Sequence, residues 1–181
     1  MDKLRRPFRR VVTGHDANGK SCVFMDSDAP NVTKRPTGSI FTEFWTIENA
    51  PAVISGNKDG GDRPLSISPP DLGAHFRIVD APAEKEAAID AKTAGENISS
   101  LNLTGTSEHR PDGPHWNMHR TATVDYGFVL EGDRVLILED SELVVHPGDV
   151  IVHLGSWHSW ENRTNDMGAT AFDMIGGEFP D

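Results

Sequence analysis

Two histidines and one aspartate, His119, Asp125 and His158, are the residues of this 181-residue chain whose types and spacing could support chemistry. If residues 119–125 form one strand, His119 and Asp125 lie on the same face, because side chains alternate along a strand. Two histidines and one carboxylate form a donor set that suits Fe, Mn, Co, Ni or Zn. Without a metal, the same groups in an interior of low dielectric constant could take a proton from a carbon next to a carbonyl and return it.

Less demanding interpretations of the same residues stay open. His119 could be a buried histidine that hydrogen-bonds to a neighbouring Thr or Asp in a polar interior without any metal. Asp125 could serve only to orient the His119 ring. The sequence is equally compatible with one divalent transition metal and with no cofactor.

Residues near these three are candidates for contacts with a substrate. By strand parity, Thr121 shares a face with His119. Trp160 likewise shares a face with His158, while Trp157 points to the opposite side. Aromatic rings in this region would suit a flat, apolar ligand, although packing of a barrel explains them equally well.

The segment before His119 adds two more candidates, His115 and Trp116. His115 could supply a further metal ligand or stay at the rim of the site. Pro114 makes the local backbone irregular, so both placements stay open. The remaining histidines have no matching partner in the pattern and are interpreted as structural: His15, His75, His109, His146 and His153.

The elements that must position these side chains are short strands. Between residues 119 and 176 apolar and polar side chains alternate, and Gly132-Asp133 and Pro147-Gly148 suit tight turns. The expected strands cover residues 124–130, 134–138, 143–145 and 150–152. Strands at this spacing, joined by tight turns, predict an antiparallel sandwich or barrel.

The front half of the chain is also rich in strand patterns. Strands are expected over residues 10–13, 21–25, 39–47 and 74–79, and Asn18-Gly19 between the first two predicts a hairpin. Residues 50–73 read as a long loop that covers a site or an interface. A short helix is expected over residues 83–94, opened by Pro82 and closed by Gly95.

The strand patterns of the two halves together predict one structural domain. Strands of the second half are apolar on both faces, so their outer face needs a cover. We expect residues 1–110 to supply strands, loop and helix that pack on a core formed by residues 111–181. The surplus of apolar strand surface also predicts a homodimer, in which front strands of one subunit cover the sheet of the other.

Composition excludes several functional classes. A net charge of −11 repels phosphate backbones, so no nucleic-acid partner is expected. No apolar stretch approaches the length of a membrane span, so no membrane partner is expected either. The single cysteine, Cys22, and an N-terminus without an apolar run predict a cytoplasmic location.

Two segments resemble the paired signature motifs of the cupin superfamily. His119, Asp125 and Gly132 follow the frame of the first motif, and His158 and Asn162 follow the frame of the second. The His119-Arg-Thr run resembles that of a group of small single-domain cupins. The chain departs from the general pattern because a threonine stands at the second histidine of the first motif and an aspartate at its glutamate. The resemblance covers the last third of the chain closely and the front half loosely.

This resemblance implies an antiparallel jelly-roll β-barrel, usually dimeric, to which the sequence adds an N-terminal β-hairpin and one short helix. It does not fix a reaction. We expect an enzyme for a carbonyl-containing, aromatic or polyketide-like metabolite, acting as a lyase, isomerase, decarboxylase or oxygenase. The alternative is a cupin that binds a small ligand without turnover. A transcriptional sensor of that kind usually carries a DNA-binding domain, and the sequence has no helix-turn-helix pattern, which favours the enzyme.

Overall fold

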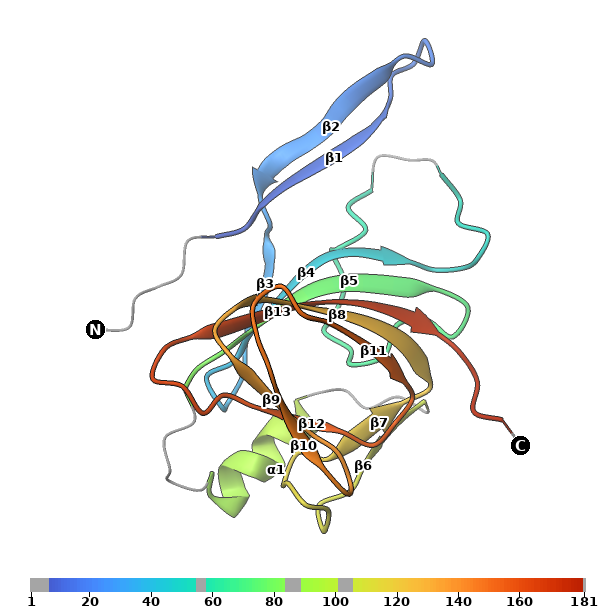
Figure 1. Ribbon diagram of the computed structural model, residues 1–181. Coiled ribbons are helices and arrows are strands. Elements are labelled where there is room, and N and C mark those ends of the chain that lie inside the picture. The colour runs from blue at the N-terminus through green and yellow to red at the C-terminus, as the bar shows by residue number, and fades with distance from the viewer. Residues whose placement is uncertain (1–6, 55–57, 84–88, 101–105, 181) are drawn as a thin grey trace.

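The computed structural model describes residues 7–54, 58–83, 89–100 and 106–180. These residues form an all-β jelly-roll barrel with one α-helix, which confirms the predicted fold class (Figure 1). Within the same ranges no helix is long and apolar enough to cross a bilayer. In chain order the elements are β1 (Arg9–His15), β2 (Ser21–Asp28), β3 (Asn31–Lys34), β4 (Ile40–Ile47), β5 (Ala74–Ala81), α1 (Ala91–Ser99), β6 (Ser107–His109), β7 (His119–Thr121), β8 (Thr123–Glu131), β9 (Arg134–Ile137), β10 (Glu142–Val145), β11 (Val150–Leu154), β12 (Ser159–Glu161) and β13 (Gly168–Gly176).

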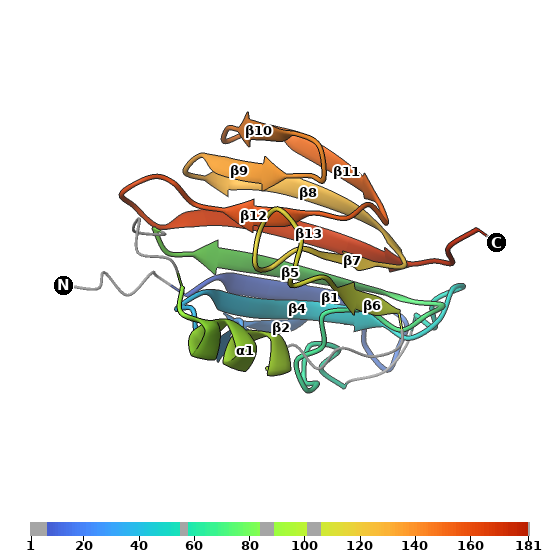
Figure 2. The same cartoon turned by 90° about the horizontal axis from the view of Figure 1, so that it is seen from below.

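The barrel has a large wall and a smaller one. The large wall, called the main sheet here, has the strand order β11-β8-β13-β5-β4-β3, and every neighbouring pair is antiparallel. The smaller wall consists of the sheet β10-β9-β12 and the pair β6-β7. In Figure 1 the main sheet arches over the smaller strands, and in Figure 2 its strands cross the molecule side by side.

Strand β8 shows how the sequence places a carboxylate inside the barrel. Its burial alternates, so that Thr123 and Asp125 are buried while Tyr126 and Phe128 point outward. Asp125 is 3% exposed and Tyr126 is 40% exposed. This is the period of two that the sequence displays, and it sends a polar side chain into the interior and apolar ones to the surface.

The front half of the chain enters the barrel more deeply than predicted. β5 lies between β13 and β4, and it pairs with β13 along its whole length. Residues 1–110 are therefore not a layer packed on a core of residues 111–181, because β3, β4 and β5 are part of the main sheet itself. Local patterns give the position of a strand along the chain, whereas strand order depends on long-range pairing.

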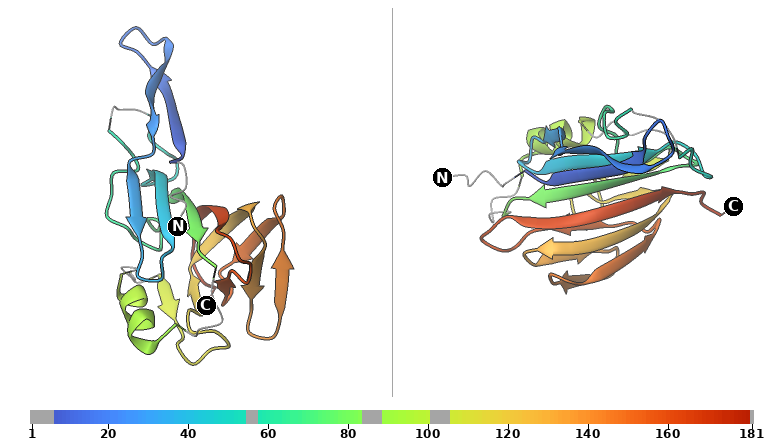
Figure 3. Two further views of the ribbon diagram at one scale, coloured as in Figure 1. Left: turned by 90° about the vertical axis from the view of Figure 1, so that its left-hand side faces the viewer. Right: turned by 90° about the horizontal axis from the view of Figure 1, so that it is seen from above.

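The predicted hairpin forms from β1 and β2, with Gly19 at a φ of 77° in its turn. The prediction that it packs onto the main sheet is wrong, because the hairpin projects away from the barrel (Figure 1 and left view of Figure 3). Only its base is anchored. Phe8, just before β1, packs on Ile78 of β5, and Arg10 forms an ion pair of 2.6 Å with Asp59.

The helix lies further along the chain than the predicted range of residues 83–94, of which residues 84–88 lie outside the described part. Asp90 caps its N-terminus by accepting a hydrogen bond from the third backbone N–H that follows. Gly95, expected to end the helix, lies inside it. The helix continues past this glycine because Asn97, two residues further along, is buried against the barrel, and such tertiary contacts override local propensity.

The predicted loop at residues 50–73 contains no strand or helix in its described part. Two of its apolar side chains, Leu65 and Ile67, pack against Phe41 of β4. Ile98 of α1 joins the same cluster. The loop and the helix together thus cover the inner side of the main sheet next to β4 and fix one end of the cavity described below.

The outer face of the main sheet carries large, exposed apolar side chains. Phe128 of β8 is paired in register with Val150 of β11, and Tyr126 with Val152. All four are between 40% and 56% exposed. A contiguous apolar surface of this kind marks an interface. The homodimer stays a prediction, and this face is its expected centre.

We expect Val152→Glu to convert the dimer to a monomer, because it places a charge in the middle of the buried face. Sedimentation velocity at micromolar concentration measures this. Val144→Glu, at an equally exposed valine of β10 on the smaller wall, is the control and should leave the dimer intact. A wild-type protein that sediments as a monomer would contradict the prediction.

Candidate active site

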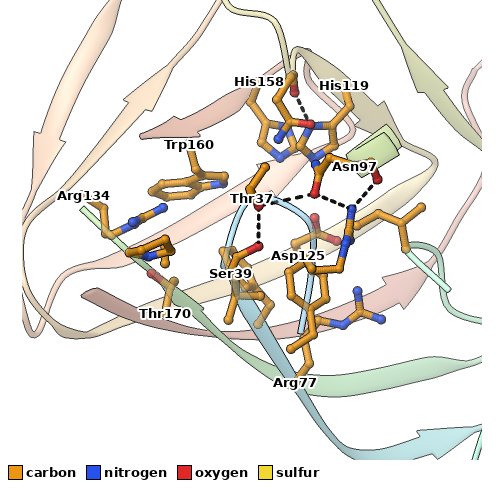
Figure 4. A pocket seen from close by; sticks show the side chains of 18 of the residues that line it. Thr37, Ser39, Arg77, Asn97, His119, Asp125, Arg134, His158, Trp160 and Thr170 are labelled. Carbon is orange, nitrogen blue, oxygen red and sulfur yellow. Dashed lines mark hydrogen bonds between the residues drawn. The ribbon is translucent and has the colours of Figure 1, made fainter. Parts of the chain in front are cut away.

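A pocket lies between the main sheet and the smaller wall (Figure 4). Its empty volume is about 1050 Å³, a figure that includes the open solvent at its mouth. The apolar part of its lining includes Phe41, Val79, Trp116, Trp160, Phe172 and Met174. The polar part includes Arg35, Thr37, Asn97, His119, Asp125 and His158. Both halves of the chain therefore build the pocket.

The backbone brings the two predicted histidines together. His119 begins β7 and His158 directly precedes β12. The N–H of each donates to the carbonyl of the other, both at 2.9 Å, as in an antiparallel bridge. Directly paired residues point to the same side of a sheet, and the centres of the two imidazole rings are 4.5 Å apart (Figure 4).

Both imidazoles are held in the same tautomer. The Nδ1–H of His119 donates to the carbonyl of Asn117 at 2.7 Å, and that of His158 donates to the carbonyl of Ser156 at 2.8 Å. A carbonyl can only accept, so each Nδ1 carries the proton and each Nε2 carries the lone pair. Each Nε2 is thereby left as a base or a metal ligand.

Burial keeps the histidine pair neutral. It lowers the pKa of His119, and it lowers the pKa of His158 well below its ordinary value. Repulsion between the histidines lowers the pKa of His158 further. At neutral pH both rings are therefore proton acceptors rather than cations.

A third histidine, His153 of β11, stacks on His158. Their ring centres are 4.1 Å apart and the planes differ by 18°. Burial lowers the pKa of His153 to about 4, and its Nε2 has no hydrogen-bond partner among the residues that the structure describes. The sequence interpretation missed this contact. The available signal was parity, because Val152 and Leu154 point outward and His153 therefore points inward with its cross-strand partner Asp125.

Asp125 lines the same pocket, toward Arg77 in the view of Figure 4. Burial raises the pKa of its carboxyl to about 6. A hydrogen bond from Thr123 and the positive charge of Arg77 lower this pKa, but their effect is smaller than that of burial. Its Oδ1 has no hydrogen-bond partner in the described part of the chain. A carboxyl in this state is protonated much more often near neutral pH than an exposed one, so it can both donate and accept a proton.

The predicted metal set does not assemble. Among the described residues, no three side chains of His, Cys, Asp or Glu are grouped closely enough to hold a metal ion. His119 and His158 face each other across a backbone bridge, whereas the short side chain of Asp125 extends from the main sheet. The histidine pair has the tautomer that metal ligands use, but the three-residue set predicted from the sequence does not fit a metal.

Comparison with known proteins identifies the family, although no family model matches the chain. The chain is 33% identical over 168 residues to the cupin-domain-containing oxidoreductase virC of Hypocrea virens, and the match covers 90% of this chain and 71% of the relative. It is 44% identical over 171 residues to the phomopsin biosynthesis cluster protein D of Diaporthe leptostromiformis, covering 90% and 74%. The chain belongs to the cupin family. A solved cupin 2 conserved barrel domain protein of Salinispora arenicola is 12% identical, with a TM-score of 0.42 and coverage of 82% and 84%.

Two candidate residues of this cupin lie beside the pocket rather than in its lining. Thr121, at the second histidine position of the first cupin motif, is buried and shares a hydrogen bond of 2.6 Å with the hydroxyl of Thr123. The Nδ1 of His115 accepts a hydrogen bond of 2.7 Å from the hydroxyl of Ser159. Neither side chain lines the pocket. Their predicted substrate contacts stay predictions.

The tryptophans divide as strand parity suggests. Trp116 and Trp160 line the pocket. Trp160 packs edge-on against Phe172, with ring centres 5.8 Å apart, and so forms part of an aromatic wall. Trp157 faces the other way, where it packs on Met118 and lies under the guanidinium of Arg110 at 4.2 Å.

Sequence reasoning missed the polar residues that the front half contributes to the pocket. These residues are Arg35, Thr37, Ser39, Arg77 and Asn97. They come from the turn before β4, from β5 and from α1. They belong to no cupin motif, and their mutual contacts join positions that are far apart in the chain, so no local pattern marks them.

The raised pKa of Asp125 predicts that this carboxylate destabilises the fold at neutral pH. As the pH rises from about 4 to about 6, the Asp125 carboxyl loses its proton in the unfolded chain before it does so in the folded chain. The free energy of unfolding therefore falls over this range, and the loss is complete above the folded pKa of about 6. We expect Asp125→Asn to raise the free energy of unfolding at pH 7 by roughly 1 to 3 kcal/mol, with no gain below about pH 4. Urea denaturation at both pH values measures this.

Asp112→Asn, at an exposed aspartate, is the matched control and should change stability little at either pH. A loss of stability at pH 7 in Asp125→Asn would contradict the assignment, because it would mean that the ionised carboxylate is favourable in the fold.

Proposed function

We propose that this cupin is an enzyme of secondary metabolism that moves a proton next to a carbonyl group of an aromatic or polyketide-like compound. The observation that carries the proposal is the pair of neutral imidazoles, His119 and His158, in an aromatic-lined pocket, where neither Nε2 atom forms a hydrogen bond with the described residues. An imidazole that is unprotonated at neutral pH can act as a general base toward a C–H bond next to a carbonyl.

The proposed step uses the histidine pair and Asp125, which all line the pocket. The Nε2 of one histidine takes the proton, the C–H electron pair moves toward the carbonyl, and an enolate oxygen forms. The carbonyl that accepts from Nδ1 stabilises the imidazolium produced. Asp125, with a pKa near 6, supplies a proton or a hydrogen bond to the enolate. In a substrate whose enolate is conjugated with a C=C bond, return of the proton to the far carbon of that bond completes an isomerisation.

The relatives support the metabolic setting. One is named for a phomopsin biosynthesis cluster, and another for an oryzines biosynthesis cluster, of Aspergillus oryzae. Membership of the same family and an aromatic pocket support a role for this chain as an enzyme of secondary metabolism.

A second candidate function is metal-assisted oxidoreduction. It is favoured by the Nδ1 hydrogen bonds of both histidines, which are typical of metal ligands, and by the similarity to virC, which is named a cupin-domain-containing oxidoreductase. A divalent metal on this pair would polarise a chelating substrate. The histidines would then act as ligands and not as bases.

The test follows exchange of the benzylic protons of phenylpyruvate in D2O by NMR. We expect the wild type to catalyse the exchange, and His119→Ala and His158→Ala each to slow it by roughly 100-fold or more, because general-base catalysis contributes at least that factor. His146→Ala, at an exposed histidine paired with Asp133, is the control and should keep full activity.

A chelator separates the two candidates. Exchange that continues unchanged in EDTA supports proton transfer by the histidines, whereas exchange that stops and returns with one added divalent metal favours the second candidate. Binding of phenylpyruvate without any exchange would contradict both and leave the ligand-binding alternative.

A further inference from the structure

Arg35 is the most unusual group in the pocket outside the histidine pair. It lies in the turn between β3 and β4, where the N–H of Arg35 donates to the carbonyl of Ser39 at 2.8 Å. Its side chain is only 3% exposed. The guanidinium reaches α1, where Nη2 donates to the carbonyl of Asn97 at 2.6 Å and to its side-chain oxygen at 2.9 Å. The turn and the helix thus hold this cation in the pocket lining.

The other two nitrogens of the guanidinium, Nε and Nη1, form no hydrogen bond within the described part of the chain. Both nitrogens are buried. No carboxylate of those residues forms an ion pair with Arg35, although nearby Arg77 is paired with Glu43 at 3.0 Å. Burial, and then the charge of Arg77, lower the pKa of Arg35 to about 10. A buried cation without a counter-charge is costly.

Contacts with neutral groups offset only part of this cost. The guanidinium carbon lies 5.0 Å from the ring centre of Phe41, in the range of a cation–π contact. Asn97 provides two neutral acceptors. Three N–H bonds, one on Nε and two on Nη1, still need acceptors. An anion would supply both these acceptors and the counter-charge.

The other groups that line the pocket indicate the chemical nature of the rest of the ligand. The hydroxyls of Thr37 and Ser39 lie beside Asn97 in the same lining (Figure 4). The aromatic wall of Trp160 and Phe172 and the ring of Trp116 line the same cavity. A ligand that uses all of these groups is anionic at one end and flat and apolar at the other.

We propose that Arg35, with the hydroxyls of Thr37 and Ser39, binds the carboxylate of an aromatic acid whose ring lies against the tryptophans of the pocket. That this acid is the substrate rests on the proposed function. The binding itself does not, because it needs neither histidine. A carboxylate matches the geometry of guanidinium N–H donors, and an apolar body favours it over a small inorganic anion.

The test compares a charged and a neutral ligand of nearly the same shape, 2-naphthylacetate and 2-naphthylacetamide, by isothermal titration calorimetry at neutral pH. We expect the wild type to bind the acid at least about tenfold more tightly than the amide, since a charge-assisted hydrogen bond supplies that factor. Inorganic phosphate at millimolar concentration should not displace the acid. Equal binding of acid and amide, or displacement by phosphate, overturns the proposal.

Arg35→Gln should abolish the preference for the acid, and Arg35→Lys, which keeps the charge without the planar donors, should retain part of it. Arg9→Gln, at an exposed arginine of the projecting hairpin, is the control. The thermal midpoint of ligand-free Arg35→Gln should not fall below that of the wild type, because an uncompensated charge is removed. A preference that survives in Arg35→Gln overturns the proposal.

The double variant His119→Ala/His158→Ala distinguishes this inference from the proposed function. It should lose proton exchange and keep the preference for the acid. Loss of the preference in this variant would assign the carboxylate to the histidines and overturn the role of Arg35.

Discussion

The backbone bridge between His119 and His158 is the interaction on which the site depends. It joins β7, whose other partner among the described strands is β6, to the segment that enters β12 of the other small sheet. The smaller wall of the barrel is closed by this link, so the histidines are positioned by main-chain hydrogen bonds rather than by side-chain contacts. Each Nδ1 then bonds to a carbonyl of its own segment. The Nε2 atoms are left for chemistry without loss of structure.

The interior around this bridge holds several buried charges. Arg77 lies between the carboxylate of Glu43, at 3.0 Å, and Asp125, whose charge acts on it favourably. Arg35 and Asp125 each have buried polar atoms without partners in the described structure. Such groups reduce stability, and they are typical of functional sites because a ligand or a reacting group completes their interactions. The barrel tolerates them because its strands are held by continuous antiparallel ladders.

The sequence predicted the part of the site that depends on local geometry. Strand parity placed Asp125 inside the barrel, because parity follows from positions along a single strand. The pairing of His119 with His158 was expected from the resemblance to the two cupin motifs, because a contact between distant strands does not follow from a local pattern. The link between Arg35 and Asn97 could not be predicted, since it joins residues 62 positions apart through a strand order that no local pattern encodes. The helix was predicted at the wrong residues for the same reason, namely that a long-range contact decides its position. The end of α1 depends on burial against the barrel and not on Gly95.

The site therefore has two parts with separate origins. The histidines depend on the bridge between β7 and the start of β12, whereas Arg35 depends on the turn before β4 and on α1. No hydrogen bond of the described residues connects Arg35 to either histidine. Substitutions in groups that share no partner act nearly independently. A cupin built in this way can change the anionic end of its ligand through the front half while the chemistry of its histidine pair stays the same.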